Sequence, residues 1–254
     1  MPERDRRRQK AMNAPMPIET PSIVLLCAAP RSGKSYTIRW LLTTLAMAGK
    51  FDYGVVFSTS GKVNGDYDYV PQQYVHAEYT DEKLAAILRH QDKRRSLRPP
   101  SSGPSGPNGA SALKGQGSNL PTKVRECPPM FLVFDDMTGQ VNMNSKVFTR
   151  LITSYRHYNI TLFFAAHLIT RVSTVFRECC RYAFIFKQNT SRSVDSLWNE
   201  FFQDIPRDQL KEFIDEYTAR KYSYLKVQCD AGADDGRYTT GQAPANFPMR
   251  HLSY

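Results

Sequence analysis

Short apolar runs alternate along the chain with amphipathic stretches, and this alternation predicts a sheet covered by helices. A run that is apolar throughout is typical of a strand buried on both faces. Six runs are expected to form strands, at residues 23–27, 53–58, 130–135, 159–166, 182–187 and 222–228. Apolar residues at helical spacing predict helices at residues 34–48, from Thr80 onward, and at 144–157, 173–180, 193–202 and 207–221. We therefore predict an α/β fold with a mainly parallel central sheet and helices on both faces.

The junction between the first strand and the first helix carries a phosphate-binding pattern. It reads Ala28-x-x-x-x-Gly33-Lys34-Ser35, a P-loop with Ala in place of its first Gly. Backbone N–H groups of such a loop surround a phosphate, and the helix that follows directs its N-terminal dipole at the same anion. We predict nucleotide binding by Ala29, Pro30, Arg31, Ser32, Gly33, Lys34, Ser35 and Tyr36. The alternative is a strand–turn–helix corner that binds no ligand.

Within this loop two side chains have distinct expected roles. Lys34 is expected to reach the β- and γ-phosphates and so to take part in catalysis, and the Ser35 hydroxyl is expected to ligate Mg²⁺. The predicted small-molecule ligands are therefore ATP and Mg²⁺.

The third apolar run ends in two carboxylates, Asp135 and Asp136. Acids that end a strand beside a P-loop are what hydrolysis of a magnesium nucleotide requires. We expect Asp135 to hold the metal and its water shell, and Asp136 to orient or deprotonate the attacking water.

The fourth apolar run is followed by a polar residue, His167. If this strand lies between the P-loop strand and the acidic strand, His167 reaches the γ-phosphate and can sense it. A structural role for this histidine is an equally good interpretation. Arg156 precedes the same strand and Arg177 follows it.

Composition suggests a polyanionic partner. The chain has 34 Lys and Arg against 24 Asp and Glu, a formal net charge of +10. This excess favours nucleic acid, although a basic protein without such a partner remains the alternative. No apolar run approaches the ~20 residues that span a bilayer, and the Arg-rich start lacks an apolar signal region, so we expect no membrane partner. Five scattered cysteines favour a reduced intracellular setting.

Composition also divides the chain. We predict a basic flexible arm at 1–21, a P-loop ATPase domain at 22–228 and a C-terminal tail of loop or disorder at 229–254. A Gly-, Pro- and Ser-rich insertion at 93–129 interrupts the domain. Three tyrosines, Tyr67, Tyr69 and Tyr74, follow the second strand. We favour hydrophobic packing for them over stacking on bases.

Several of these segments, in order, resemble the poxvirus-type DNA-packaging ATPases of the FtsK–HerA superfamily, within the RecA-like class. The segments that carry the resemblance are residues 28–35, 51–58, 64–69, 131–136, 156–160, 176–179 and 186–188. The most discriminating are Arg-His-Tyr-Asn-Ile at 156–160 and Arg-Glu-Cys at 177–179. Two features depart from the family pattern, which usually has Gln where His167 stands and lacks the insertion.

The resemblance implies a homo-oligomeric ring, a hexamer or pentamer, that uses ATP to load viral double-stranded DNA into a preformed capsid. It further implies an arginine finger that reaches into the neighbouring subunit's site, with Arg156 the first candidate and Arg177 the second. Capsid proteins are implied partners. The implied location is an intracellular viral assembly site in the host cell, or association with the virion.

Two other functions stay open. One is a non-viral FtsK–HerA-like translocase or a phage assembly ATPase. The other is a nucleotide-binding scaffold protein without turnover, against which the second acid of the 135–136 pair argues.

Overall fold

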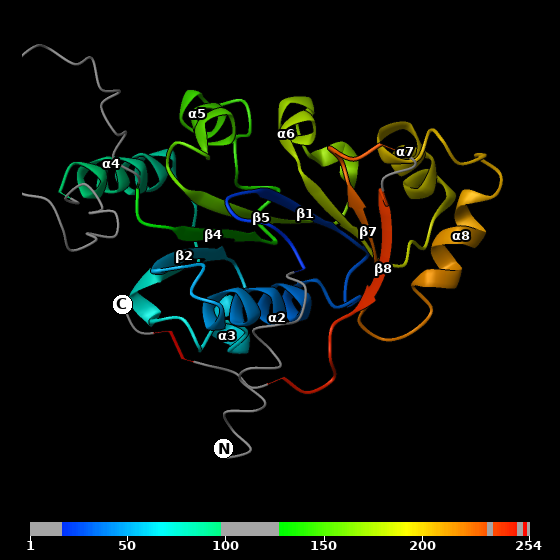
Figure 1. Ribbon diagram of the computed structural model, residues 1–254, viewed down its shortest axis with the longest axis horizontal. Helices are drawn as coiled ribbons and strands as arrows, with labels where there is room; N and C mark the ends of the chain where they lie inside the picture. Colours follow the sequence, from blue (N-terminus) through cyan, green and yellow to red (C-terminus); the bar gives the residue numbers. More distant parts are fainter. Residues whose placement is uncertain (1–16, 98–126, 233–235, 248–250, 253–254) are drawn as a thin grey trace, which may run out of the picture.

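The computed structural model describes residues 17–97, 127–232, 236–247 and 251–252. These residues form an eight-stranded sheet with helices on both faces (Figure 1). The order of the strands is β3-β2-β4-β5-β1-β6-β7-β8. The first six of these are mutually parallel. At one edge, β7 pairs antiparallel with β6, and β8 pairs antiparallel with β7. The predicted α/β fold with a mainly parallel sheet is confirmed.

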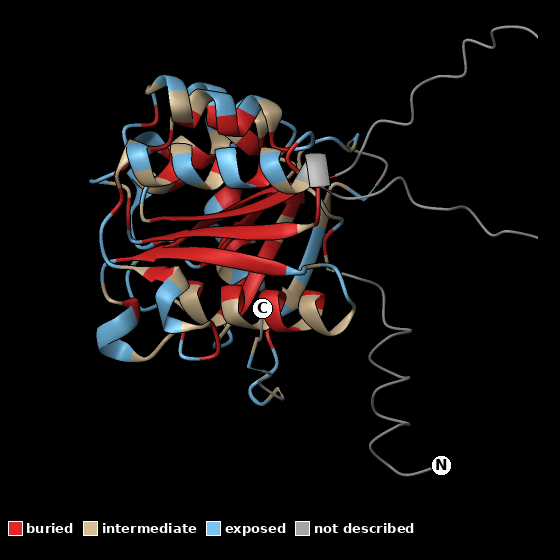
Figure 2. Ribbon diagram, turned by 90° about the vertical axis from the view of Figure 1, so that its left-hand side faces the viewer, coloured by how far each residue is buried: buried red, intermediate tan, exposed pale blue. Residues whose placement is uncertain are grey.

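Each predicted strand is present, and two further strands complete the sheet. The strands are β1 (Ile23–Cys27), β2 (Tyr53–Ser58), β3 (Val75–His76), β4 (Met130–Asp135), β5 (Ile160–Ala166), β6 (Tyr182–Ile185), β7 (Ser223–Gln228) and β8 (Tyr238–Gln242). β1, β2, β4, β5 and β6 are buried along their whole length, which explains their uninterrupted apolar character (Figure 2). β3 has only two residues, and β8 is largely exposed, so neither produces an apolar run.

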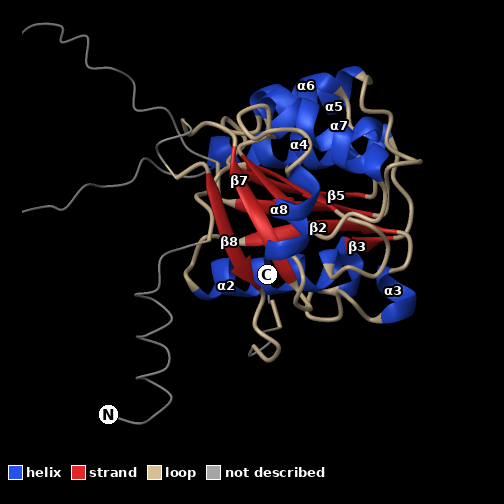
Figure 3. Ribbon diagram, turned by 90° about the vertical axis from the view of Figure 1, so that its right-hand side faces the viewer, coloured by secondary structure: helices blue, strands red, loops and turns tan. Residues whose placement is uncertain are grey.

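The helices divide between the two faces of the sheet. α2 (Lys34–Met47) and α3 (Gly61–Asn64) cover one face, and α4 (Asp81–Leu97), α5 (Lys146–Ser154), α6 (Thr174–Cys179) and α7 (Ser191–Phe201) cover the other (Figure 1). α8 (Leu210–Tyr217) lies beside β7, near the antiparallel edge (Figure 3). Two short 3₁₀ turns, η1 (Gln72–Tyr74) and η2 (Ile169–Arg171), complete the described elements.

Helix starts follow the expected capping chemistry. The side chains of Ser145, Ser173 and Thr190 accept hydrogen bonds from the backbone N–H groups of the first turns of α5, α6 and α7. Thr80, from which the sequence predicts this helix, does the same for α4 by accepting from Lys83 N at 3.2 Å. No helix in the described part of the chain is both long and apolar enough to span a bilayer.

Two expectations for the irregular segments were wrong. Residues 93–97, assigned to the insertion, continue helix α4. The segment after Gln228, expected to be loop or disorder, contains β8, because its backbone pairs with β7 even though its side chains remain polar. The rest of the insertion from 98 to 126 and residues 1–16 of the arm lie outside the described residues. The domain boundaries themselves stay predictions.

The last residues of the predicted arm lie against the sheet. Ile18 is buried, and the carbonyl of Pro17 accepts a hydrogen bond from Lys226 Nζ at 3.1 Å. The residues just before β1 are therefore held against the sheet by a hydrogen bond from β7.

Aromatic side chains fill the core between the sheet and α5. Phe134 of β4 stacks on Phe57 of β2 at 5.2 Å and also contacts Tyr79, Phe148 and Phe164. On the opposite face Tyr67 and Tyr69 are completely buried in the cluster around α2, and the partly buried Tyr74 packs against both clusters. The packing interpretation of these tyrosines is therefore confirmed.

Replacing Phe134 with Ala is expected to destabilise the fold by about 3–5 kcal/mol, because it opens a cavity that four aromatic neighbours cannot refill. Urea unfolding followed by circular dichroism measures this change. Val63→Ala is the control, since Val63 is 86% exposed and its truncation is expected to change stability by less than about 0.5 kcal/mol. Equal midpoints for the two variants would contradict the role assigned to this cluster.

Candidate functional site

The loop between β1 and α2 has the geometry of an anion-binding turn. Gly33 has φ +99° and Arg31 has φ +61°, both in the left-handed region. A Cβ on Gly33 would lie 2.8 Å from Cδ1 of Tyr222, so a glycine is required there for space as well as conformation. Ala28 does not adopt a left-handed conformation. Its replacement of the usual first glycine therefore costs no turn freedom.

The other predicted loop residues lie along the same turn. Pro30 and Arg31 are exposed at its tip, and the Ser32 hydroxyl donates to the carbonyl of Ala29. Ser35 and Tyr36 occupy the first turn of α2, behind the loop.

Lys34 is folded into the loop and is almost completely buried, at 6% exposure. Its Nζ donates to the carbonyl oxygens of Ala28 at 3.0 Å and Ala29 at 3.3 Å, and lies 3.0 Å from Nδ1 of His167. Burial lowers the pKa of Lys34, and the negative charges of Asp136 and Asp135 act in the opposite direction. The ammonium is held by weak neutral acceptors, so an arriving anion offers it a much stronger partner.

The strand order explains why these residues meet. β5 lies between the P-loop strand β1 and the acidic strand β4, and all three strands are parallel. Their carboxyl ends therefore share one edge of the sheet. His167 follows β5 at this edge, between the two others, so the condition stated for its contact with the γ-phosphate is met.

His167 connects the two halves of the site. Its Nε2 lies 2.9 Å from Oδ1 of Asp136, while its Nδ1 faces Lys34. An ammonium can only donate, so Nδ1 accepts from Lys34 and Nε2 carries the proton that Asp136 accepts. Asp136 itself is exposed and has φ +57°, a conformation that aspartate tolerates better than most residues. Lys34, His167 and Asp136 thus form a continuous hydrogen-bonded chain across the site.

Asp135 is buried beside this chain, with 2% exposure. Its Oδ2 accepts a hydrogen bond from the Tyr67 hydroxyl at 2.8 Å, whereas its Oδ1 has no hydrogen-bond partner among the described residues. Burial raises the pKa of Asp135, and the interaction of its carboxyl group with the nearby Ser35 hydroxyl opposes this shift. A buried carboxylate oxygen without a partner, close to a serine hydroxyl, is suited to a hard cation such as Mg²⁺.

The protein alone supplies few ligands for such a cation. The described residues contain no group of three or more His, Cys, Asp or Glu side chains that could hold a metal. Mg²⁺ usually completes its coordination shell with water and phosphate oxygens, so Asp135 and Ser35 fit a metal that arrives with a nucleotide.

The two candidate arginines lie away from these residues. Arg156 is exposed in the α5–β5 connection, at the amino end of β5, and its Nε donates to the Tyr155 hydroxyl at 2.9 Å. The seven residues of β5 separate this edge from His167 by roughly 20 Å. Arg177 on α6 pairs with Glu200 of α7. Neither arginine is brought to the site within its own chain, and a role in a neighbouring subunit stays a prediction.

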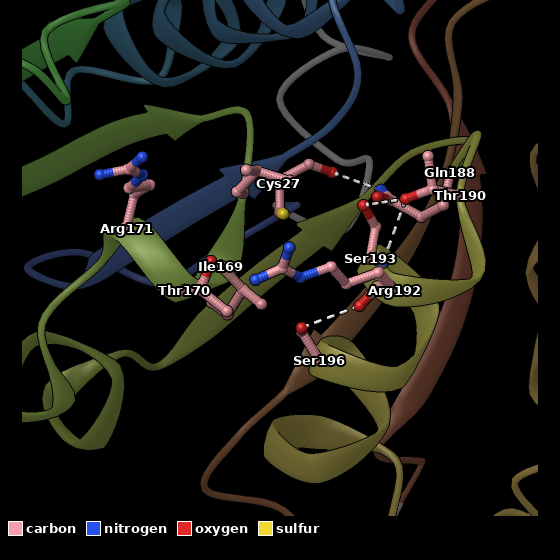
Figure 4. A pocket seen from close by; sticks show the side chains of 10 residues that line it. Cys27, Ile169, Thr170, Arg171, Gln188, Thr190, Arg192, Ser193 and Ser196 are labelled. Atoms are coloured by element: carbon pink, nitrogen blue, oxygen red, sulfur yellow. Dashed lines mark hydrogen bonds between the residues drawn. The ribbon is translucent and has the colours of Figure 1, made fainter.

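A pocket of about 510 Å³ lies at the carboxyl end of β1, on the α7 side of the sheet (Figure 4). Cys27 ends β1 at its base, and Arg171 of η2 and Arg192 of α7 contribute to its wall with several hydroxyl groups. Neither arginine forms an ion pair with any described residue. Burial raises the pKa of the Cys27 thiol to about 12, so this cysteine stays neutral.

Sequence reasoning missed Tyr67 as an acid partner and the two pocket arginines. Arg171 and Arg192 had a usable signal, since both follow strands whose carboxyl ends meet the P-loop. Tyr67 had none, because any of the three clustered tyrosines could have faced Asp135.

Solved structures share this architecture at low sequence identity. The genome packaging NTPase B204 from Sulfolobus turreted icosahedral virus 2, in complex with ATP-gammaS, is 14% identical with a TM-score of 0.55, covering 90% of this chain and 97% of that one. The pCW3 conjugation coupling protein TcpA, with ATPgS, is 14% identical with a TM-score of 0.55, covering 92% and 61%. The chain has the RecA-like P-loop NTPase fold.

A secretion ATPase has the same core. The cytoplasmic domain of the Thermomonospora curvata type VII secretion ATPase EccC is 14% identical with a TM-score of 0.54, covering 89% of this chain and 24% of that one. These similarities show that the chain shares the fold of these ATPases. No protein-family model matches the chain, and no curated protein matches its sequence.

Asp135→Asn is expected to stabilise the protein near neutral pH in the absence of nucleotide and metal, by about 1–3 kcal/mol. Because burial raises the native pKa of Asp135, ionisation of this carboxyl costs folding free energy as the pH rises above its ordinary value of 3.8. The advantage of the variant should therefore disappear as the pH falls through the raised pKa toward 3.8. Urea unfolding at a series of pH values measures this difference, and a difference independent of pH would contradict it.

Proposed function

We propose that this protein is an ATPase that translocates double-stranded DNA and packages a viral genome into a capsid. The observation that carries the proposal is the hydrogen-bonded chain from Lys34 through His167 to Asp136, beside the buried Asp135. One of the similar structures, B204, is described as a genome packaging NTPase in complex with ATP-gammaS. The match covers 97% of the B204 chain.

In this proposal the triphosphate of ATP lies in the loop at residues 29–35. Backbone N–H groups at the start of α2 bind the phosphates, and Lys34 exchanges its two carbonyl acceptors for phosphate oxygens. Asp135 and Ser35 would hold Mg²⁺, which, when bound, neutralises phosphate charge. Releasing Lys34 from His167 also frees Nδ1 of the imidazole, so the histidine registers whether the γ-phosphate is present.

Hydrolysis then needs a water molecule aligned with the γ-phosphorus. The exposed Asp136 accepts a proton from this water. At the same time the water oxygen bonds to the γ-phosphorus, and the bond between the γ-phosphorus and the β–γ bridging oxygen breaks. ADP and inorganic phosphate leave, and Asp136 returns the proton to solvent. The hydrogen bond from His167 fixes the orientation of Asp136 for this step.

The loop after His167 gives a route from the nucleotide to DNA. It leads within four residues to Arg171, in the pocket that also contains Arg192. Two arginines that have no acidic partner in the described part of the chain, in a protein of net charge +10, suit the DNA backbone. We propose that they contact phosphates and that their position changes with the state of His167.

The quaternary proposal follows the resemblance. The protein is proposed to form a homo-oligomeric ring at an intracellular site of virus assembly, with capsid proteins as partners. Arg156 is the better candidate for the arginine finger, because it is exposed, whereas Arg177 is already paired with Glu200.

A second candidate function is DNA transfer without a capsid. The similarity to the conjugation coupling protein TcpA, which covers 92% of this chain, favours it. Binding of the purified protein to empty capsids separates the two functions, since only a packaging motor is expected to dock there.

Lys34→Ala and Asp136→Asn are expected to fail at different steps. Lys34→Ala should lose ATP binding, because the loop loses its only buried cation. Asp136→Asn should keep ATP affinity close to wild type while turnover falls by about 10²–10⁴-fold, since the general base is gone. Calorimetric binding and phosphate release measure the two steps. Turnover of Asp136→Asn at the wild-type rate would contradict the assignment.

The double variant Arg171→Ala, Arg192→Ala is expected to bind duplex DNA more weakly and with less dependence on salt. Losing two phosphate contacts should reduce the slope of log K against log salt concentration by about 2. Fluorescence anisotropy with DNA of two unrelated sequences measures this slope. Arg150→Ala, an exposed arginine of α5, is the matched control. An unchanged slope in the double variant would place the DNA elsewhere.

A further inference from the structure

The proposed position of the triphosphate fixes where the nucleoside must lie, and the inference below rests on that proposed function. Asp136 and His167 follow β4 and β5, so the γ-phosphate points toward those strands. The nucleoside must then leave the loop on the opposite side, toward β6 and β7.

Two stacked tyrosines occupy that side. Tyr36 lies in the first turn of α2, and Tyr222 immediately precedes β7. β7 is antiparallel to β6, so it begins at the same edge of the sheet where the P-loop lies. The two rings are 3.9 Å apart and nearly parallel, at 13°.

Tyr222 lies directly against the P-loop in a conformation that tyrosine rarely adopts. Its φ is +64°, and its Cδ1 lies 2.8 Å from where a Cβ on Gly33 would be. A left-handed bulky residue persists only where its surroundings hold it. Here the next residue, Ser223, is already paired with Gln242 in the sheet, which fixes the backbone that presents the ring.

Tyr36 is fixed from its other end. Its hydroxyl lies 2.6 Å from the carbonyl oxygen of Pro244 and 2.7 Å from that of Ala245, and its ring contacts Phe247 edge-on at 5.4 Å. The segment after β8 therefore holds Tyr36, and Tyr36 in turn supports one face of Tyr222.

The other face of Tyr222 carries a readily displaced group. Lys221 Nζ lies 4.9 Å from the centre of the Tyr222 ring, and because Tyr36 covers one face at 3.9 Å, the ammonium lies over the opposite face. Lys221 is exposed, so its side chain can move into solvent without loss of a buried contact.

We propose that Tyr222, supported by Tyr36, is the stacking platform for the purine base of the bound nucleoside triphosphate. The base lies on the face of Tyr222 that Lys221 now covers. Every base has a π-face, so the platform adds affinity for the nucleoside and does not depend on hydrogen-bond readout. The backbone of Tyr222 thereby holds its ring beside the loop that binds the phosphates.

The test compares ATP with inorganic tripolyphosphate, which has the same anionic chain and no base. Dissociation constants are measured by calorimetry for wild type, Tyr222→Ala and Tyr222→Phe. Tyr222→Ala is expected to weaken ATP binding about 5- to 150-fold, the range found for loss of one stacked base. Its affinity for tripolyphosphate should stay at the wild-type value, and Tyr222→Phe should keep both affinities.

Tyr217→Ala is the matched control, since Tyr217 is an exposed tyrosine of α8 paired with Phe213. An equal loss of ATP and tripolyphosphate affinity in Tyr222→Ala would overturn the proposal, because Tyr222 would then only shape the loop. Unchanged ATP affinity in that variant would also overturn it. If wild type binds tripolyphosphate and Lys34→Ala does not, the phosphate site stands regardless of the outcome at Tyr222.

Discussion

The candidate site depends on one buried positive charge, the ammonium of Lys34. Two backbone carbonyls and a neutral imidazole hold it, and none of these carries a compensating charge. The nearest acids are Asp135 and Asp136. Asp135 is buried and forms no hydrogen bond with Lys34, and Asp136 is connected to Lys34 only through His167. This arrangement exists because β5 lies between β1 and β4, so that the histidine fills the gap between the loop and the acids. A triphosphate would complete the charge balance that the protein leaves open.

The same groups place a cost on stability. Burial lowers the pKa of Lys34 and raises that of Asp135, so each residue is held in surroundings that disfavour its charged form. When the charged groups of a site lack compensating partners, ligand binding releases more free energy. Such sites commonly lower the stability of the unliganded protein in return for function. The hydrogen bond from Tyr67 to Asp135 shows how limited the compensation is, because one oxygen is satisfied and the other is not. The aromatic core around Phe134, immediately before these acids, supplies the rigidity that keeps them in place.

Much of the fold could be predicted from the sequence, for identifiable reasons. Strands buried on both faces leave uninterrupted apolar runs, and the Gly33-Lys34-Ser35 pattern between a strand and a helix locates the loop. Contacts between distant residues leave no such pattern. Nothing in the sequence indicates that Tyr67 reaches Asp135 or that Tyr222 lies on Gly33. The polar strand β8 was missed for a related reason, since an exposed edge strand is defined by backbone pairing and not by apolar side chains.

The most direct test of the account is a crystal structure of the protein with a slowly hydrolysed ATP analogue and Mg²⁺. The account requires the triphosphate to lie between the loop and the two acids, with Lys34 Nζ moved from the carbonyls of Ala28 and Ala29 onto phosphate oxygens. Asp135 should then face the metal through its unpaired oxygen. A nucleotide bound elsewhere, or one bound in the loop while Lys34 keeps its contacts to Ala28 and His167, would contradict the central claim.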